Sequence, residues 1–241
     1  MKGLRGAIGF LTVLPVARSL PWQGSAMLPW FPVVGLMLGC LWIGFDIIMA
    51  MVFPCAIRAF LDVLFLIFLT GGLHLDGLAD SADGLLSHRD KKKSLEIMKD
   101  SRIGTWGVLA LMTVLGLKTL ALCEIVQKWG PALPLIMIPA YGRTAMLLGI
   151  CFLPYGRGDD GIAYELFQKG IRPEWIPGMV LTGLATLLLS RPDALVINVT
   201  FGLSVFVILA WYRLQTGCIT GDMLGALGEI TETFLLVALA A

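Results

Sequence analysis

Long apolar segments recur along the whole chain, and they constrain its fold more than any other feature. Scanned with a window of roughly 19 residues, the sequence shows about seven of them, at 29–53, 57–73, 105–127, 132–153, 175–190, 194–212 and 223–241. Most are long enough to cross a hydrocarbon core about 30 Å thick. The sequence therefore predicts an all-α, polytopic transmembrane bundle of about seven spans in a lipid bilayer, folded as a single integral domain over residues 1–241.

The composition supports this interpretation and excludes one class of partner. Hydrophobic residues make up 57% of the chain and charged residues 15%, against roughly 25% charged residues in soluble domains. The net charge is +1, so the sequence lacks the broad basic surface of a nucleic-acid-binding protein. The five cysteines are scattered without a CxxC pair, and we expect them to be small buried hydrophobes. A homo-oligomer is compatible with the sequence.

The N-terminal residues 1–16 begin with a basic Lys2 and continue with an apolar run that is too short to span a membrane. A secretory signal peptide is the alternative, but no small-residue cleavage site follows before Arg18. We therefore expect a retained re-entrant or interfacial segment.

The basic residues predict the orientation of the spans, because cytoplasmic loops retain Lys and Arg. The loop after the second predicted span carries six of them, which are Arg89, Lys91, Lys92, Lys93, Lys99 and Arg102. Placing this loop inside also places 154–174 and 213–222 inside. We expect a multi-pass protein of the cytoplasmic (inner) membrane whose polar motifs face the cytoplasm.

The acidic motif at residues 74–84, His-Leu-Asp-Gly-Leu-Ala-Asp-Ser-Ala-Asp-Gly, is the strongest chemical signal. On a helix, Asp76, Asp80 and Asp83 lie within about 60° of one another and form one stripe. Carboxylates this close repel one another unless a cation neutralises them, and Mg²⁺ binds carboxylates together with phosphate oxygens. The motif predicts a magnesium site for phosphoryl transfer, with His74 as a further candidate ligand or base. The alternative is a solvated acidic helix at the membrane surface.

A second polar cluster occupies residues 216–232. On a helix, Asp222 and Glu229 project within about 20° of each other, and Glu232 lies about 60° further round. These side chains are candidates for further metal ligands or for the catalytic base. Thr220, in a Thr/Gly-rich turn before the acidic residues, is a candidate phosphate-binding residue. Its alternative role is a simple helix cap.

Three arginines are candidates for binding substrate phosphate. Arg102 and Arg157 lie in loops, whereas Arg143 lies inside a predicted span, where a charge is costly without a partner. An arginine can hold a phosphate group with two parallel hydrogen bonds. By contrast, we interpret Arg58, Asp46 and Asp62, near the outer ends of the first two predicted spans, as forming a structural pair rather than a site.

Five motifs together resemble the cobalamin synthase family, also named adenosylcobinamide-GDP ribazoletransferases, over nearly the whole chain. They are Phe10-Leu-Thr-Val-Leu-Pro-Val, the 74–84 motif, Met98-Lys-Asp-Ser-Arg-Ile-Gly, Pro154-Tyr-Gly-Arg and Thr220-Gly-Asp-Met-Leu-Gly-Ala. The resemblance implies a membrane enzyme that joins a corrinoid nucleotide, adenosylcobinamide-GDP, to α-ribazole or its 5′-phosphate, releases GMP and requires Mg²⁺. It assigns the metal to Asp76, Asp80, Asp83 and Asp222. Either Asp83 or Asp222 is the candidate catalytic base.

Two other functions remain as alternatives. The segment Asp80-Ser-Ala-Asp-Gly84 is similar to the opening of the CDP-alcohol phosphotransferase motif, but Ser87-His88 replaces the Ala-Arg that should follow. An ion-coupled transporter would also carry intramembrane carboxylates and glycine-broken helices. Transport sites lie near the middle of the membrane, whereas these carboxylates are expected at the cytoplasmic ends of spans.

Overall fold

The structure is a computed structural model, which describes residues 2–16, 24–129, 133–157, 164–167 and 191–241. Within these ranges the regular elements are helices, and one isolated parallel bridge joins Tyr155 to Ile219. The elements are α1 (Lys2–Leu11), η1 (Gly24–Trp30), α2 (Phe31–Ala50), α3 (Cys55–Thr70), α4 (Leu73–Leu85), α5 (Lys91–Ile97), α6 (Thr105–Trp129), η2 (Leu133–Met137), α7 (Ile138–Phe152), α8 (Tyr164–Phe167), α10 (Arg191–Gln215) and α11 (Gly221–Ala240).

The predicted all-α transmembrane fold is confirmed. Among the described residues, five helical segments are long and apolar enough to cross a membrane, and α3 with α4 makes a sixth if this bent pair is one span. The predicted span at 175–190 lies outside the described residues, so the total of about seven stays a prediction. The ten-residue α1 is too short to span, and it packs against η1 and α2, in agreement with the short segment expected there.

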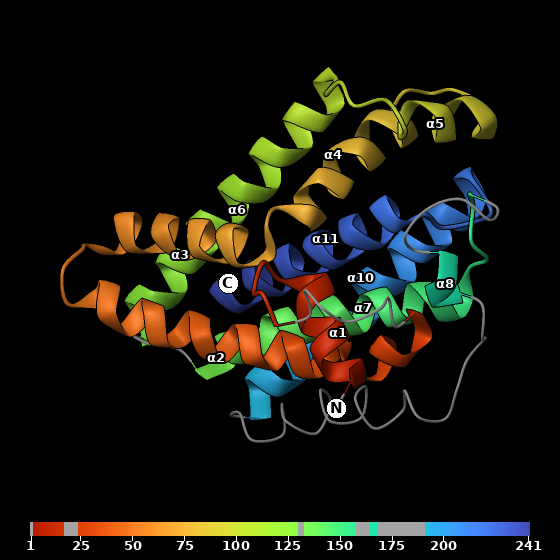
Figure 1. Cartoon of the computed structure of the whole chain (residues 1–241). Coiled ribbons are helices and arrows are strands. Elements are labelled where there is room, and N and C mark those ends of the chain that lie inside the picture. Colours follow the sequence, from red (N-terminus) through yellow and green to blue (C-terminus); the bar gives the residue numbers. More distant parts are fainter. Residues whose placement is uncertain (1, 17–23, 130–132, 158–163, 168–190) are drawn as a thin grey trace.

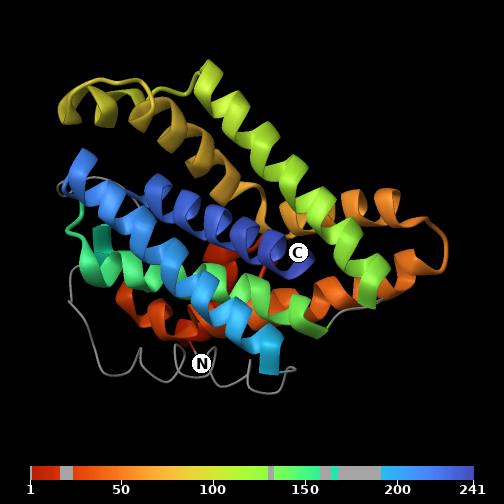
Figure 2. The same ribbon diagram turned by 180° about the vertical axis from the view of Figure 1, so that it is seen from behind.

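Helix α11 lies at the centre of the bundle, where it contacts α4, α6, α7 and α10 (Figures 1 and 2). Its crossing with α4 is close because glycines face backbone on both helices. A methyl carbon at Gly77 of α4 would lie 2.7 Å from the carbonyl oxygen of Asp222, and one at Gly225 of α11 would lie 3.0 Å from the Cα of His74. The small residues of the two motifs therefore bring the acidic stripe against the start of α11.

A sharp bend between α3 and α4 sets the direction of the acidic helix. The two helices meet at 94°, and the residues between them, Gly71 and Gly72, have φ angles of 64° and 70°. These left-handed conformations cost little for glycine and considerably more for other residues. The bend turns α4 out of line with α3 and across α11.

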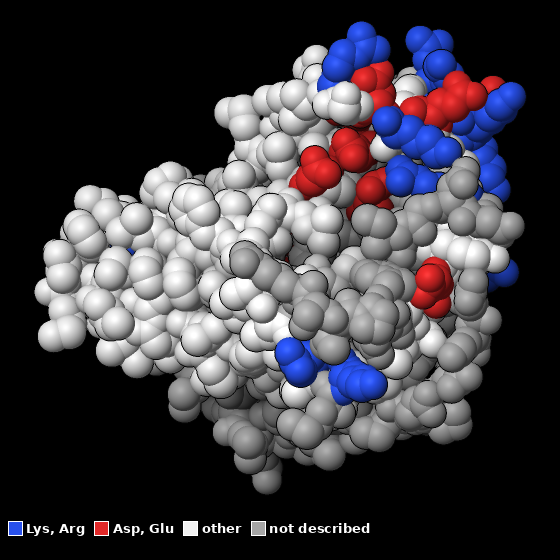
Figure 3. Space-filling view, viewed as in Figure 1, with Lys and Arg blue, Asp and Glu red and all other residues white. Residues whose placement is uncertain are grey.

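The helices run between two ends that differ in charge. Figures 1 and 2 show that the α4–α5–α6 connection, the end of α10 and the start of α11 share one end, opposite the α2–α3 turn. Charged side chains gather over this first end, whereas the visible surface toward the α2–α3 turn is nearly all uncharged (Figure 3). The segments 74–104 and 213–222, which the basic residues placed on one side, therefore lie together.

Two smaller expectations concern an ion pair between α2 and α3 and the burial of the cysteines. Arg58 of α3 forms an ion pair with Asp46 of α2, which confirms a structural pair and selects Asp46 from the two candidate carboxylates. The expected burial of the cysteines is wrong for most of them, since Cys218 is buried but Cys40 is exposed and the other three are half-buried. The outer surface of a membrane bundle faces lipid, where a small apolar thiol needs no burial in protein. The Sγ atoms of Cys55 and Cys123 lie 2.7 Å apart and join α3 to α6.

Candidate active site

The acidic stripe forms as the spacing predicts, on the helix α4. Asp76 is exposed, and Asp80 and Asp83 are half-buried. Leu78 and Leu85 are buried on another face of the helix. The stripe therefore remains accessible at the charged end of the bundle while the rest of α4 packs into the core.

Asp222 joins the stripe from the first turn of α11, where it forms an ion pair with Arg157. A short backbone ladder fixes this arginine, because Gly156 N–H donates to the Ile219 carbonyl (2.9 Å) and Ile219 N–H donates to the Pro154 carbonyl (2.9 Å). Arg157 Nη2 also donates to the carbonyl of Met98 at 3.1 Å. The contacts thus connect three of the motifs that were identified separately along the sequence.

The carboxylates are close enough to act on one another. Asp80 interacts electrostatically with Asp76, Asp83 and Asp222, and Asp222 with Asp76. Asp76, Asp222 and Arg157 line a cavity of about 330 Å³, together with His74, Tyr155 and several apolar residues. This cavity has both an acidic wall and a basic side chain, as a site for a metal-bound phosphate requires.

Asp83 has a contact that its sequence position did not reveal. Its Oδ2 accepts the N–H of Gly104 at 2.7 Å, and its Oδ1 accepts the N–H of Gly107 at 2.8 Å. These N–H groups belong to the start of α6, where a helix leaves its first donors without partners inside the helix. Asp83 therefore caps α6 from α4, and its predicted roles as metal ligand and base stay predictions.

The donor chemistry of the site fits Mg²⁺, although the protein side chains do not enclose an ion by themselves. Within the described residues, no three His, Cys, Asp or Glu side chains are arranged to hold one metal ion. Mg²⁺ commonly uses only one or two carboxylates and completes its shell with water and substrate phosphate oxygens. The all-oxygen set of Asp76, Asp80 and Asp222 meets that requirement.

The other predicted phosphate-binding residues have partners in the protein. Arg102 is exposed in the loop before α6 and pairs with Asp100 at 2.6 Å, and its hydrogen bonds lower the pKa of Asp100 to about 2. Thr220 is fully buried, and its Oγ1 accepts the N–H of Met223 at 3.2 Å, so the alternative role as a helix cap is confirmed. Phosphate contacts of Arg102 and Thr220 stay predictions.

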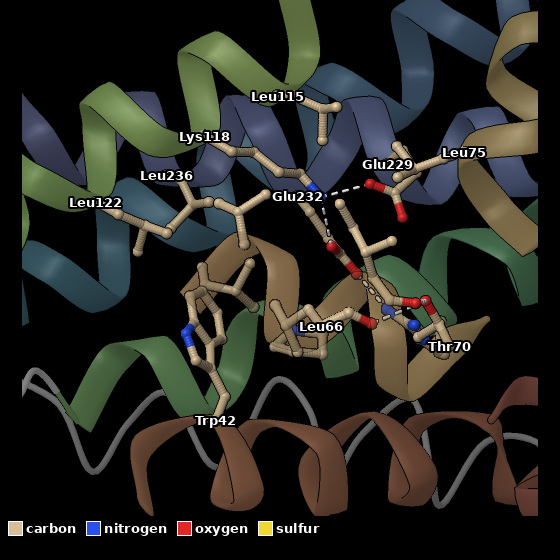
Figure 4. Close-up of a pocket in the computed structure, with 15 residues that line it drawn as sticks. Trp42, Leu66, Thr70, Leu75, Leu115, Lys118, Leu122, Glu229, Glu232 and Leu236 are labelled. Atoms are coloured by element: carbon tan, nitrogen blue, oxygen red, sulfur yellow. Dashed lines mark hydrogen bonds and ion pairs between the residues drawn. The ribbon is translucent and has the colours of Figure 1, made fainter. Parts of the chain in front are cut away.

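A buried ion-pair cluster lies deeper in the bundle, beside a small cavity of about 30 Å³ (Figure 4). Lys118 Nζ lies 2.5 Å from Glu229 and 2.9 Å from Glu232, and Glu232 also pairs with Arg143. Glu229 and Glu232, candidate ligands or bases in the sequence, thus face cations instead of the acidic stripe. Arg143 is absent from the residues that line the 330 Å³ cavity, and its direct contact with phosphate stays a prediction.

Lys118 is the residue that the sequence analysis missed. A signal for it was present, because a lysine in the middle of a 25-residue apolar helix is costly without a buried partner. The carboxylates available to pair with it are Glu229 and Glu232 of α11. No local sequence pattern links these glutamates to a lysine on α6.

Comparison with known proteins identifies the family. A family model described as cobalamin-5-phosphate synthase matches residues 3–240. A relative from Synechococcus sp., named adenosylcobinamide-GDP ribazoletransferase, is 36% identical over 98% of this chain and 94% of its own. Relatives of the same name from Desulforamulus reducens and Acetivibrio thermocellus are 36% and 34% identical over 98% of this chain and 94% and 96% of theirs. No solved structure is similar to the chain. The chain is therefore a transferase of the cobalamin-5-phosphate synthase family that serves cobalamin synthesis.

Proposed function

We propose that this chain is a Mg²⁺-dependent phosphotransferase that joins adenosylcobinamide-GDP to α-ribazole, or to α-ribazole 5′-phosphate, with release of GMP. The observation that carries the proposal is the convergence of Asp76, Asp80 and Asp222 beside Arg157 at the charged end of the bundle. The names of the relatives, which match almost the whole chain, support the substrate. The step would be a late one in the synthesis of adenosylcobalamin.

The proposed reaction is a displacement at phosphorus. A ribose hydroxyl of the acceptor attacks the phosphorus on the corrinoid side of the pyrophosphate, a new P–O bond forms, and the bridging oxygen leaves with GMP. An acceptor that carries a 5′-phosphate has no free 5′-hydroxyl, so a different ribose hydroxyl must attack if both acceptors react.

The hydroxyl proton needs an acceptor within hydrogen-bond reach. Of the two candidate bases, Asp222 is the better placed, because it lines the cavity. Asp83 already uses both carboxylate oxygens to accept backbone N–H groups, so its oxygens are less free to accept the hydroxyl proton.

When bound, Mg²⁺ would neutralise the pyrophosphate and favour the displacement. Asp76, Asp80 and Asp222 are the side chains we propose to hold it, and Asp83 could contribute a lone pair that its backbone hydrogen bonds leave free. Arg157 is placed to share its donors between Asp222 and a phosphate oxygen, since a guanidinium carries five of them.

The proposed location is the cytoplasmic membrane, with the site facing the cytoplasm. The basic residues of the α4–α6 connection support this orientation, and they lie at the same end as the carboxylates (Figure 3). A site at one end of the bundle also favours catalysis over ion-coupled transport, whose sites lie near the middle of the membrane.

The deciding experiment is a turnover assay with the purified full-length protein and Mg²⁺. Adenosylcobinamide-GDP with α-ribazole is compared with CDP-diacylglycerol and an alcohol, and the nucleotide released is identified. We expect GMP from the first pair, only when Mg²⁺ is present. Release of CMP from the second pair, without GMP from the first, would contradict the proposal and favour a lipid-headgroup transferase.

A further inference from the structure

Three aromatic side chains gather beside the acidic site, where the chain leaves α7 and meets α8 (Figures 1 and 2). The ring of Tyr155 lies 4.9 Å from that of Phe167 and 6.1 Å from that of Tyr164, measured between ring centroids. All three residues are half-buried, so packing holds their rings in place while part of each remains accessible to a ligand. None of these residues, which we call the aromatic cluster, has a role in the proposed reaction.

Tyr155 lines two cavities. One is the 330 Å³ cavity of the acidic site. The other is an open cavity of about 640 Å³, which Tyr155 lines together with Tyr164, Phe167 and residues at the end of α7. None of the described residues that line this second cavity is charged, and the remaining ones are Ile150, Cys151, Phe152, Leu153 and Pro154. A charged cavity and an aromatic cavity therefore meet at Tyr155.

The backbone holds Tyr155 close to Arg157. Tyr155 forms a parallel bridge with Ile219, and the hydrogen bonds of Pro154 and Gly156 to Ile219 fix the residues on either side of it. Tyr155 and Arg157 are two residues apart in the chain, so their Cα atoms lie no more than about 7 Å apart. Both side chains line the 330 Å³ cavity. An aromatic ring and a phosphate-binding group are thus separated by about the width of one sugar.

The lining of the second cavity favours an apolar aromatic ring as its ligand. Aromatic side chains bind planar rings by stacking, and a lining without charge suits a ring with few hydrogen-bonding groups. The proposed reaction involves two bases. Guanine carries an amide and an amino group, which need polar partners when they are buried. The base of α-ribazole is a dimethylbenzimidazole, whose nitrogen outside the glycosidic bond is its only hydrogen-bonding atom. The second base is the better match.

We propose that the aromatic cluster binds the benzimidazole base of the acceptor nucleoside, with the ring of Tyr155 stacked on the base. The ribose of the acceptor then extends from Tyr155 toward Arg157 and Asp222, where its hydroxyl meets the pyrophosphate. The inference rests on the proposed function, because that reaction supplies the acceptor. It assigns acceptor specificity to Tyr155, Tyr164 and Phe167, whereas the acidic stripe binds the phosphate groups.

Kinetic variants test the stacking. Tyr155→Leu and Phe167→Leu keep an apolar side chain but remove the aromatic face. We expect KM for α-ribazole to rise about fivefold to a hundredfold, as for the loss of one base–aromatic stack, while KM for adenosylcobinamide-GDP stays unchanged. Tyr155→Phe keeps the ring and should keep KM for α-ribazole near that of the parent. An unchanged KM for α-ribazole in both leucine variants, or an equal rise in KM for both substrates, would overturn the proposal.

Phe65→Leu is the matched control for the loss of an aromatic ring. Phe65 of α3 stacks on Phe45 of α2 with 4.3 Å between ring centroids, and it lines neither cavity. We expect both KM values to match those of the parent. If Phe65→Leu raises KM for α-ribazole as much as Tyr155→Leu does, the effect comes from general packing and the base site is refuted.

Cys151 locates the ligand without an activity assay. It lines the second cavity and is half-buried, and its reaction with a small methanethiosulfonate reagent can be followed by mass spectrometry of the peptide that contains it. We expect saturating α-ribazole to slow the modification of Cys151 several-fold and to leave that of the exposed Cys40 unchanged. Guanosine should give no protection. Equal protection by guanosine, or none by α-ribazole, would overturn the proposal.

The base site can fail or stand independently of the proposed reaction. If α-ribazole protects Cys151 in the parent but not in Tyr155→Leu, the base site is supported even in a protein that releases no GMP, and only the reaction is contradicted. If the protein releases GMP but both leucine variants keep the parent KM for α-ribazole, the base site alone is refuted.

Discussion

Replacing Asp83 by Asn separates a structural cap from a metal ligand. The two carboxylate oxygens of Asp83 accept the N–H groups of Gly104 and Gly107 at 2.7 and 2.8 Å. Asn keeps one acceptor oxygen and turns an NH₂ group toward the other N–H, so one hydrogen bond to a charged group is lost. Such a bond contributes about 1.5–3 kcal/mol. We expect the free energy of unfolding to fall by about that amount, and Tm to fall by about 3–12 °C for a chain of this size.

Asp76→Asn is the matched control from the same helix. Asp76 is exposed, so we expect its replacement to change the free energy of unfolding by less than about 0.5 kcal/mol. If Asp76 helps to hold Mg²⁺, the same change should raise the Mg²⁺ requirement steeply. Turnover should fall about a hundredfold or more, which corresponds to about 3 kcal/mol of transition-state stabilisation.

The assay measures both properties on one set of proteins. Asp76→Asn, Asp80→Asn and Asp83→Asn are purified in the same detergent, their thermal unfolding is followed, and GMP release is measured across a Mg²⁺ titration. Unchanged Mg²⁺ dependence in all three variants would remove the metal site from the proposed function. An Asp83→Asn protein as stable as the parent would refute the cap, whatever its activity.

Three further predictions concern topology and packing. A cysteine introduced at Lys92 should react with an impermeant thiol reagent only in opened cells, and labelling of intact cells would contradict the cytoplasmic orientation. Mild oxidation of membranes should crosslink Cys55 to Cys123, because their Sγ atoms are 2.7 Å apart. After proteolysis between α3 and α6, the two fragments should stay joined on a non-reducing gel, and their separation would contradict this packing. Lys118→Met should cost about 3–5 kcal/mol in the free energy of unfolding, because it leaves two buried carboxylates with one cation, and a Tm equal to that of the parent would show that the ion pairs contribute no stability.

The sequence alone determined the features that depend on local pattern. Apolar length predicts membrane helices because the bilayer thickness sets the number of residues required. The spacing of Asp76, Asp80 and Asp83 predicts a common face because helix geometry fixes it, and α4 bears this out. The resemblance indicated the family from five short motifs, and the comparisons confirm it.

Only the tertiary structure decided which group each charged side chain faces. Asp83 caps a helix that begins 22 residues after it, and Glu229 pairs with Lys118, which lies 111 residues away along the chain. Such pairings depend on where helices cross, and the crossing of α4 with α11 is set by the contact of Gly77 with the backbone at Asp222. The carboxylates of the acidic stripe and of α11 look alike in the sequence. The fold divides them into two groups. Asp222 joins the acidic stripe at the accessible end of the bundle, whereas Glu229 and Glu232 are buried and are neutralised by Lys118 and Arg143. The buried group needs these cations because a charge inside the bundle requires a partner of opposite sign.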